Sequence, residues 1–160
     1  MIHFNIICVG KLKEKYLKDA TDEYLKRLSK YCKIDIIEIQ DESLPGKLND
    51  SIIEDIKEKE GKKILDSIKN PSYVLTLDLK GKQFSSEEFS DKIENIALQG
   101  YSDITLIIGG TLGLSNNVIN ASHELISFSK MTFPHQLIRV FLLEQIFRAF
   151  KISHNETYHW

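Results

Sequence analysis

Apolar runs and amphipathic segments alternate along residues 1–70. Residues 2–9 and 33–39 are apolar runs rich in β-branched side chains, which predict two strands. Between them, apolar side chains recur with the spacing of one helix face, at Tyr16, Leu17, Ala20, Tyr24, Leu25 and Leu28. Strand, helix and strand in this order predict a βαβ unit with parallel pairing.

The same alternation continues to the C-terminus. A helical pattern over residues 52–68 precedes a strand over 72–79, which we expect Gly81 to end. Ser85 with Glu88 predicts a capping box at the next helix. The remaining predicted elements are a buried strand over 104–110, a short helix near 116–122, a strand over 124–129 and a long helix from Pro134. Strands interleaved with helices in this way predict a single α/β domain over residues 1–160, with a mostly parallel sheet covered by helices on both faces.

The long C-terminal helix has apolar side chains on nearly every side. They are Leu137, Ile138, Val140, Phe141, Leu142, Leu143, Ile146, Phe147, Ala149 and Phe150. Such a helix must be covered on more than one face. We expect the sheet to cover one face and a second copy of the chain to cover another, which predicts a homodimer. The alternative is a helix buried deeply within one chain.

Length and composition favour one cytoplasmic domain. The chain has 160 residues and 42% hydrophobic content, enough for one sizeable core. It contains no apolar run of the roughly 20 residues that a membrane helix needs. Its first apolar run carries charges after it rather than before it, so we expect no cleaved leader. Cys8 and Cys32 belong to no metal-type spacing, and we expect buried, reduced thiols and no metal site.

Charge is distributed unevenly along the chain, although the net charge of -2 gives no whole-molecule reason to expect a nucleic-acid partner. Residues 1–33 hold eight Lys and Arg against four acids, whereas residues 34–60 hold nine acids against three Lys. The segment from residue 129 onward is again mildly basic. This polarity could orient the molecule on RNA. The alternative is a set of solvated helix faces that are uneven by chance.

Three loops follow predicted strands at the edge where open α/β sheets bind ligands. They are residues 77–82, 108–114 and 127–136. Glycines at 109, 110 and 113 allow the backbone of the second loop to approach a ligand closely, because they carry no Cβ. Their spacing matches neither a P-loop nor a dinucleotide-binding fingerprint. A purely structural turn is therefore the alternative.

The third loop is rich in small polar side chains and leads into the long helix. Pro134 suits the first position of a helix, and the free amides at that helix start are available to a ligand. This combination favours an adenosine-like ligand. The alternative is plain capping of the helix by Thr132, with His135 as a surface residue.

The tail concentrates polar and aromatic side chains that no apolar period explains as core. They are His154, Tyr158, His159 and Trp160. We interpret the tail as a mobile arm that supplies an acid/base group and an aromatic platform for a nucleobase. The alternative is a disordered chain end.

Taken together, these segments resemble one known family. Its motifs appear here, in order and over essentially the whole chain, as VGKLKEKYLKDATDEYLKRL, DLKGKQFSSEEF, IIGGTLGL, SFSKMTFPHQLIRVFLLEQIFRAFKI and a closing ETYH. The sequence resembles the ribosomal RNA large subunit methyltransferase H family, within the SPOUT superfamily of knotted methyltransferases.

The resemblance implies a deep trefoil knot in the C-terminal half and S-adenosylmethionine (SAM) held in a bent pose by the three loops. The implied SAM contacts are Leu77, Gly109, Phe128, Ser129, Lys130, Met131, Thr132 and Phe133. It further implies that the long C-terminal helix builds the homodimer. The tail of the second subunit would then help to complete each active site.

The implied reaction transfers the SAM methyl group to N3 of a pseudouridine in 23S ribosomal RNA on the assembled 70S ribosome, without a metal. The implied catalytic residues are His135, Arg139, Tyr158 and His159. Which of them is the base stays open. Arg139 or Arg148 would contact phosphate or stabilise negative charge on the uracil ring.

The tail departs from the family pattern, in which an arginine and a glycine precede this Glu-x-Tyr-His end and a basic residue follows it. Here His154 and Asn155 stand before it and Trp160 after it, so that Trp160 offers stacking in place of a charge. Two alternatives therefore stay open. One is a SPOUT methyltransferase with another RNA target, and the other is a ribosome-associated binding protein without enzymatic activity.

Overall fold

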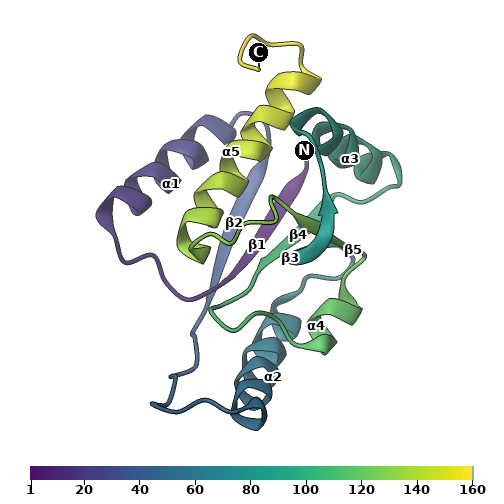
Figure 1. The fold of residues 1–160 in the computed structure, drawn as a ribbon. Coiled ribbons are helices and arrows are strands. Elements are labelled where there is room, and N and C mark those ends of the chain that lie inside the picture. Colours follow the sequence, from purple (N-terminus) through teal and green to yellow (C-terminus); the bar gives the residue numbers. More distant parts are fainter. Residues whose placement is uncertain (160) are drawn as a thin grey trace.

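The computed structural model describes residues 1–159, in which five strands form one sheet. The strands are β1 (His3–Val9), β2 (Lys33–Ile39), β3 (Tyr73–Gln83), β4 (Asp103–Ile108) and β5 (Glu124–Ser127). Their order is β2-β1-β4-β3-β5, and every neighbouring pair is parallel (Figure 1). The prediction of an α/β fold around a parallel sheet is confirmed.

Helices cover both faces of this sheet. Helices α1 (Lys15–Leu28), α3 (Ser86–Leu98) and α5 (His135–Ser153) lie on one face, and α2 (Asp50–Ser67) and α4 (Asn116–Ala121) lie on the other (Figure 1). Both faces of the sheet need this cover because side chains alternate along β1. Phe4 and Ile6 pack against α1, α3 and α5, while Ile7 and Val9 pack on the face that α2 and α4 cover. Within residues 1–159, no helix has the length and apolar character needed to cross a membrane.

Polar side chains define where several helices begin. The capping box is confirmed, since Ser85 Oγ accepts from the Glu88 amide at 3.0 Å and Glu88 Oε1 accepts from the Ser85 amide at 3.4 Å. At α2 the Asn49 side chain accepts from the Ile52 amide, and at α4 the Ser115 side chain accepts from the Val118 amide. Each cap satisfies an amide that the first helical turn leaves unpaired, which sets the first residue of the helix.

Gly81 lies inside β3, so the expectation that it ends the strand is wrong. The strand runs to Gln83, and Leu77 and Lys82 both pair with Ile126 of β5, which leaves residues 78–81 as a bulge. A Cβ on Gly81 would lie 2.5 Å from the Ile126 carbonyl carbon. Glycine is needed here because another backbone passes close to it.

Helix α5 lies between α1 and α3 against the sheet (Figure 1). Its buried residues are Arg139, Leu142, Leu143, Ile146, Phe147, Ala149 and Phe150. Tyr31, which follows α1, stacks on Phe150 with ring centroids 5.5 Å apart. One chain therefore covers most of the apolar surface of α5, and the predicted homodimer stays a prediction. Phe141 remains 38% exposed.

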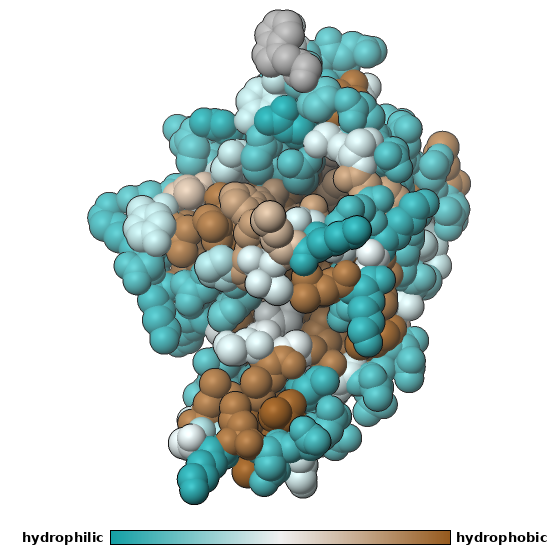
Figure 2. Space-filling model, in the orientation of Figure 1, coloured by the Kyte–Doolittle hydropathy of each residue, from teal (hydrophilic) through white to brown (hydrophobic). Residues whose placement is uncertain are grey.

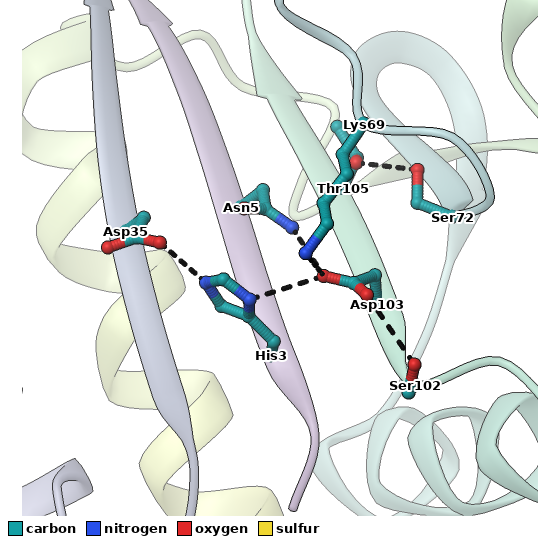
Figure 3. A network of polar contacts seen from close by, with 8 residues as sticks. All are labelled: His3, Asn5, Asp35, Lys69, Ser72, Ser102, Asp103 and Thr105. Carbon is teal, nitrogen blue, oxygen red and sulfur yellow. Dashed lines mark hydrogen bonds and ion pairs between the residues drawn. The ribbon is translucent and has the colours of Figure 1, made fainter.

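Polar side chains join three strands at the amino-terminal edge of the sheet (Figure 3). His3 of β1 lies between Asp35 of β2, at 2.6 Å, and Asp103 of β4, at 3.2 Å. Asn5 donates to the Asp103 carboxylate at 3.1 Å, and Lys69 lies at the same distance from it. Burial alone would raise the pKa of Asp103, but the hydrogen bonds from Lys69 and Asn5 hold it below its ordinary value. These contacts align the strands at the edge opposite the predicted ligand loops.

Both cysteines are buried free thiols, as the sequence predicts. Burial raises the pKa of Cys8 to about 11 and that of Cys32 to about 12. The thiols are therefore protonated at neutral pH and pack as small apolar side chains.

Replacing Gly81 with alanine should destabilise the fold, because the added methyl group would overlap the backbone of Ile126. We expect the free energy of unfolding to fall by about 1–3 kcal/mol, the usual cost of over-packing, as measured by urea denaturation. Gly46→Ala is the matched control, since nothing lies within 4 Å of the Cβ that it adds. Equal unfolding midpoints for both variants would contradict a close approach of β5 to Gly81.

Candidate functional site

A cavity of about 570 Å³ lies at the carboxyl edge of the sheet, beside the bulge of β3 and the ends of β4 and β5. Its walls come from residues 77–80, 108–114 and 126–135. In Figure 2, apolar surface (brown) and near-neutral surface (white) meet in the middle of this face of the molecule. The volume is that of a pocket for a small organic molecule. The three loops that the sequence singles out therefore meet at one place.

The cavity collects most of the side chains predicted to hold a cofactor. Those that line it are Leu77, Gly109, Phe128, Ser129, Met131, Thr132 and Phe133. Lys130 belongs to the same loop, and its side chain is exposed. His135, predicted as a catalytic residue, also lines the cavity.

The apolar floor of the cavity was not predicted. It includes Ile108 at the end of β4, Ile126 in β5 and Ile138 in α5. The strand pattern marks Ile108 and Ile126 as core, and their position at the ends of parallel strands was the signal for a second role. For Ile138 the sequence offered no signal, because only the packing of α5 brings it to the sheet edge.

The glycine loop is packed too tightly to accept side chains. A Cβ on Gly109 would lie 2.8 Å from Leu114 Cγ, and one on Gly110 would lie 3.0 Å from Val9 Cγ1. Gly113 has a φ of 86°, which favours glycine. Bare backbone therefore forms this wall of the cavity, and a flat ligand can lie directly against it.

The loop before α5 is held in shape by its own serines. Ser127 Oγ donates to the Ser129 carbonyl at 2.9 Å, and Ser129 Oγ accepts from the Met131 amide at 3.0 Å. Pro134 is the cap residue of α5, one position before its expected place, and within residues 1–159 no side chain caps this helix start. The alternative that Thr132 serves as the cap is therefore wrong, and Thr132 faces the cavity instead.

His135 stands where the cavity wall meets the end of β1. Its Nε2 atom lies 3.6 Å from the position that a Cβ on Gly10 would take. Burial lowers the pKa of His135, the positive charges of Arg139 and Lys13 lower it further, and only Asp41 opposes them. The imidazole is therefore neutral at pH 7 and able to accept a proton. Within residues 1–159, no three or more His, Cys, Asp or Glu side chains form a group that could hold a metal ion.

Arg139 points away from the cavity, into the layer between α5 and the sheet. It is 2% exposed, and it donates to Glu38 Oε2 at 2.8 Å and to the Gly10 carbonyl at 3.3 Å. Burial alone would raise the pKa of Glu38, but the Arg139 hydrogen bond and charge hold it below its ordinary value. Within one chain, Arg139 therefore contacts β2 and the end of β1, and its expected contact with the substrate stays a prediction.

The tail folds back onto α5. The ring of Tyr158 packs on Phe147 with centroids 5.0 Å apart, and its hydroxyl donates to Glu144 at 3.0 Å. Glu156 accepts from Lys151 at 2.7 Å. Residues 154–159 are therefore docked, which corrects the expectation of a mobile arm and the alternative of a disordered end. Trp160, which we expected to offer stacking, lies outside the described residues.

The tail and the cavity lie at opposite ends of α5. His159 contacts Arg148 at 3.2 Å and Glu87 at 2.5 Å, near the C-terminal end of that helix. Helix α5 has 19 residues and is therefore about 28 Å long. Within one chain, the structure brings His135 to the cavity but not Tyr158 or His159.

Comparison with known proteins shows which family the chain resembles over its whole described length. Residues 2–159 match the family model described as "Predicted SPOUT methyltransferase". The chain is 59% identical over 158 residues to the ribosomal RNA large subunit methyltransferase H of Clostridium acetobutylicum, with 99% of each chain covered. The proteins of that name from Clostridium botulinum strain Eklund 17B and Clostridium novyi are 58% and 56% identical over 158 residues, again with 99% of each chain covered.

These matches define first a class and then a family. The cavity at the carboxyl edge of a parallel sheet, with the full-length family match, places the chain among the SPOUT methyltransferases. Within that class, the chain belongs to the ribosomal RNA large subunit methyltransferase H family.

Strong acid should release the tail from α5. Hydrogen bonds from Lys151 and Tyr31 hold the pKa of Glu156 at about 2, against an ordinary value of 4.5. Because the folded pKa is depressed, the stabilisation is complete above about pH 4.5 and is lost as the pH falls towards 2. We expect the NMR signals of the Tyr158 ring to move to exposed positions over that range.

Glu156→Gln removes the charge and keeps the shape, so its tail should already be partly released at neutral pH. Glu58→Gln, at an exposed position of α2, is the control and should behave as the parent protein. Tyr158 signals that stay at their docked positions in Glu156→Gln would show that this carboxylate does not hold the tail.

Proposed function

We propose that this protein is a SAM-dependent methyltransferase that acts on ribosomal RNA. The observation that carries the proposal is the meeting of the glycine loop, the end of β3 and the loop before α5 in one cavity of about 570 Å³. The chain belongs to a family whose relatives carry the name of a methyltransferase of large-subunit ribosomal RNA. The bare backbone of the glycine loop, which forms one wall of this cavity, supports a ligand with a flat heterocycle.

The chain provides the groups that such a cofactor needs. When bound, SAM supplies a methyl group on a positively charged sulfur, which is an activated electrophile. The bare backbone at Gly109 suits the adenine ring, while Ser129 and Thr132 offer polar groups to the sugar. Leu77 and Met131 line the same space and offer apolar contact. We propose Phe128, Lys130 and Phe133 as further contacts.

The proposed target is N3 of a pseudouridine in 23S ribosomal RNA, modified on the assembled 70S ribosome in the cytoplasm. The chain must align N3 with the methyl carbon and accept the N3 proton as the nucleophile forms. His135 lines the cavity, and its lowered pKa leaves it neutral and able to accept that proton. Tyr158 or His159 of a second copy is the alternative acceptor.

A homodimer is part of the proposal. Phe133 and Phe141 are each 38% exposed, with ring centroids 5.7 Å apart, and they border an apolar groove of about 260 Å³. A second copy packed on this surface would cover it. Two-fold symmetry could then bring the tail of one chain to the cavity of the other, which the length of α5 prevents within one chain.

The family also implies a deep trefoil knot in the C-terminal half. The close passage of β5 beside Gly81 supports it, because a chain that is threaded through a loop packs closely against the backbone of that loop.

Calorimetric titration of SAM, followed by incubation with labelled SAM and unmodified 70S ribosomes, tests the proposed activity. We expect saturable binding and label in 23S RNA at the pseudouridine N3, with less transfer to free 50S subunits. Gly109→Trp presses a side chain against Leu114, which also lines the cavity, and should weaken SAM binding at least about 100-fold, a loss of roughly 2.7 kcal/mol; circular dichroism checks that the variant is folded. Gly46→Trp, in open space, is the control.

Label at a different nucleotide would favour a SPOUT methyltransferase with another target. Ribosome binding without SAM binding would favour the non-enzymatic alternative.

Mixed dimers test whether the tail acts on the partner's cavity. Gly109→Trp and the double variant Tyr158→Ala/His159→Ala should each be inactive alone. When the two variants are co-expressed in equal amounts with different tags, half of the dimers are mixed. Each mixed dimer contains one intact composite site out of two, so about a quarter of the parent activity should return. If the tail serves its own chain, the mixture should stay inactive.

A further inference from the structure

The loop between β1 and α1 presents two exposed lysines next to the cavity. Lys11 and Lys13 are both exposed, and no ion pair within residues 1–159 involves either of them. Lys15, which follows them in α1, is by contrast paired with Asp19 at 2.8 Å. We refer to Lys11 and Lys13 as the lysine pair.

The backbone that carries the lysine pair is held by an ion pair whose arginine is buried. Arg139 donates to the Gly10 carbonyl at 3.3 Å and to Glu38 Oε2 at 2.8 Å. The same Glu38 oxygen accepts from the Leu12 amide at 3.3 Å. The residues directly before and between the two lysines are therefore fixed to α5 and β2, while the lysine side chains remain in solvent.

A further contact ties the lysine pair to the rim of the cavity. The Lys13 amide donates to Gln136 Oε1 at 3.3 Å. Gln136 follows His135, which lines the cavity and stands against Gly10. A ligand that reaches the cavity from this side passes the lysine pair.

Several lysines lie around the cavity despite the net charge of -2. They stand beside acids, since Asp78 lines the cavity and Glu14 follows Lys13 in the loop. Arg139 pairs with Glu38, the acid whose carboxylate accepts from the Leu12 amide of this loop. Lys80 lines the cavity from the end of β3, and Lys130 is exposed in the loop before α5. Cations therefore flank the cavity both at the β1 side and, across β4, at the β3 side.

We propose that the lysine pair binds backbone phosphates of the RNA next to the reacting nucleotide, and that Arg139 is the positioning residue that holds it in place. This inference rests on the proposed function and adds to it the surface on which the RNA lies. A loop already fixed by hydrogen bonds loses little conformational freedom when RNA binds. Two exposed ammonium groups on such a loop are suited to phosphate, which they meet as point charges.

The salt dependence of ribosome binding tests the lysine pair. Each lysine–phosphate contact contributes roughly 0.7–0.9 to the slope of log K against log salt concentration, so Lys11→Gln/Lys13→Gln should reduce it by about 1.4–1.8. The probe is the unmodified 70S ribosome, titrated at several salt concentrations. KM for ribosomes should rise about tenfold at physiological salt, while the Kd for SAM stays unchanged.

Lys33→Gln/Lys62→Gln is the matched control, because both lysines are exposed and lie outside the cavity walls, one at the start of β2 and one in α2. Its slope should equal that of the parent protein. An unchanged slope in Lys11→Gln/Lys13→Gln overturns the proposal. A parent protein that transfers no methyl group would instead overturn the proposed function, and the two failures are therefore distinguishable.

The positioning of the loop that carries the lysine pair is tested at two of its anchors, Gln136 and Arg139. Gln136→Ala removes the anchor of the Lys13 amide without touching the core, and it should raise KM for ribosomes several-fold with the same Kd for SAM. Arg139→Lys keeps the charge but cannot reach both Glu38 and the Gly10 carbonyl, so it should lower the salt slope towards that of the lysine double variant. If both variants keep the parent slope and KM, Arg139 has no part in RNA binding.

Discussion

The passage of β5 beside Gly81 is the contact on which the ligand site depends. Because Leu77 and Lys82 both pair with Ile126, the residues between them leave the ladder and become one wall of the cavity. After Ser127 the same strand continues into the loop that forms the opposite wall. One close backbone contact therefore positions two of the three ligand loops, and a side chain at Gly81 would separate them.

The second constraint is the buried Arg139. Removing a guanidinium from water costs several kcal/mol unless its partners are well placed. Glu38 and the Gly10 carbonyl supply those partners, one from β2 and one from the end of β1. The ion pair thus joins α5 to two strands at the edge where the cavity lies. The same ion pair positions the loop that follows β1 and the start of α5, where His135 lies one turn before Arg139.

The unpaired positive charges near the cavity matter more for RNA binding than the net charge of the chain. A net charge of -2 opposes long-range attraction of RNA, but acids and bases are paired over much of the surface, as in α1 and α2. The lysines left without a partner near the cavity are Lys11, Lys13, Lys80 and Lys130 within residues 1–159. A small basic rim is sufficient for a substrate that is itself a large, preformed surface.

The sequence by itself determined the features that depend on neighbouring residues. The periods of two and 3.6 define the strands and helices, Ser85 and Glu88 define a cap, and the glycines after β4 mark a ligand loop, because each of these is a local backbone property. Only the tertiary structure decided the role of Gly81, the inward direction of Arg139 and the docking of Tyr158. Each of these depends on which distant segment passes by, and a residue pattern along one segment does not specify its neighbours in space.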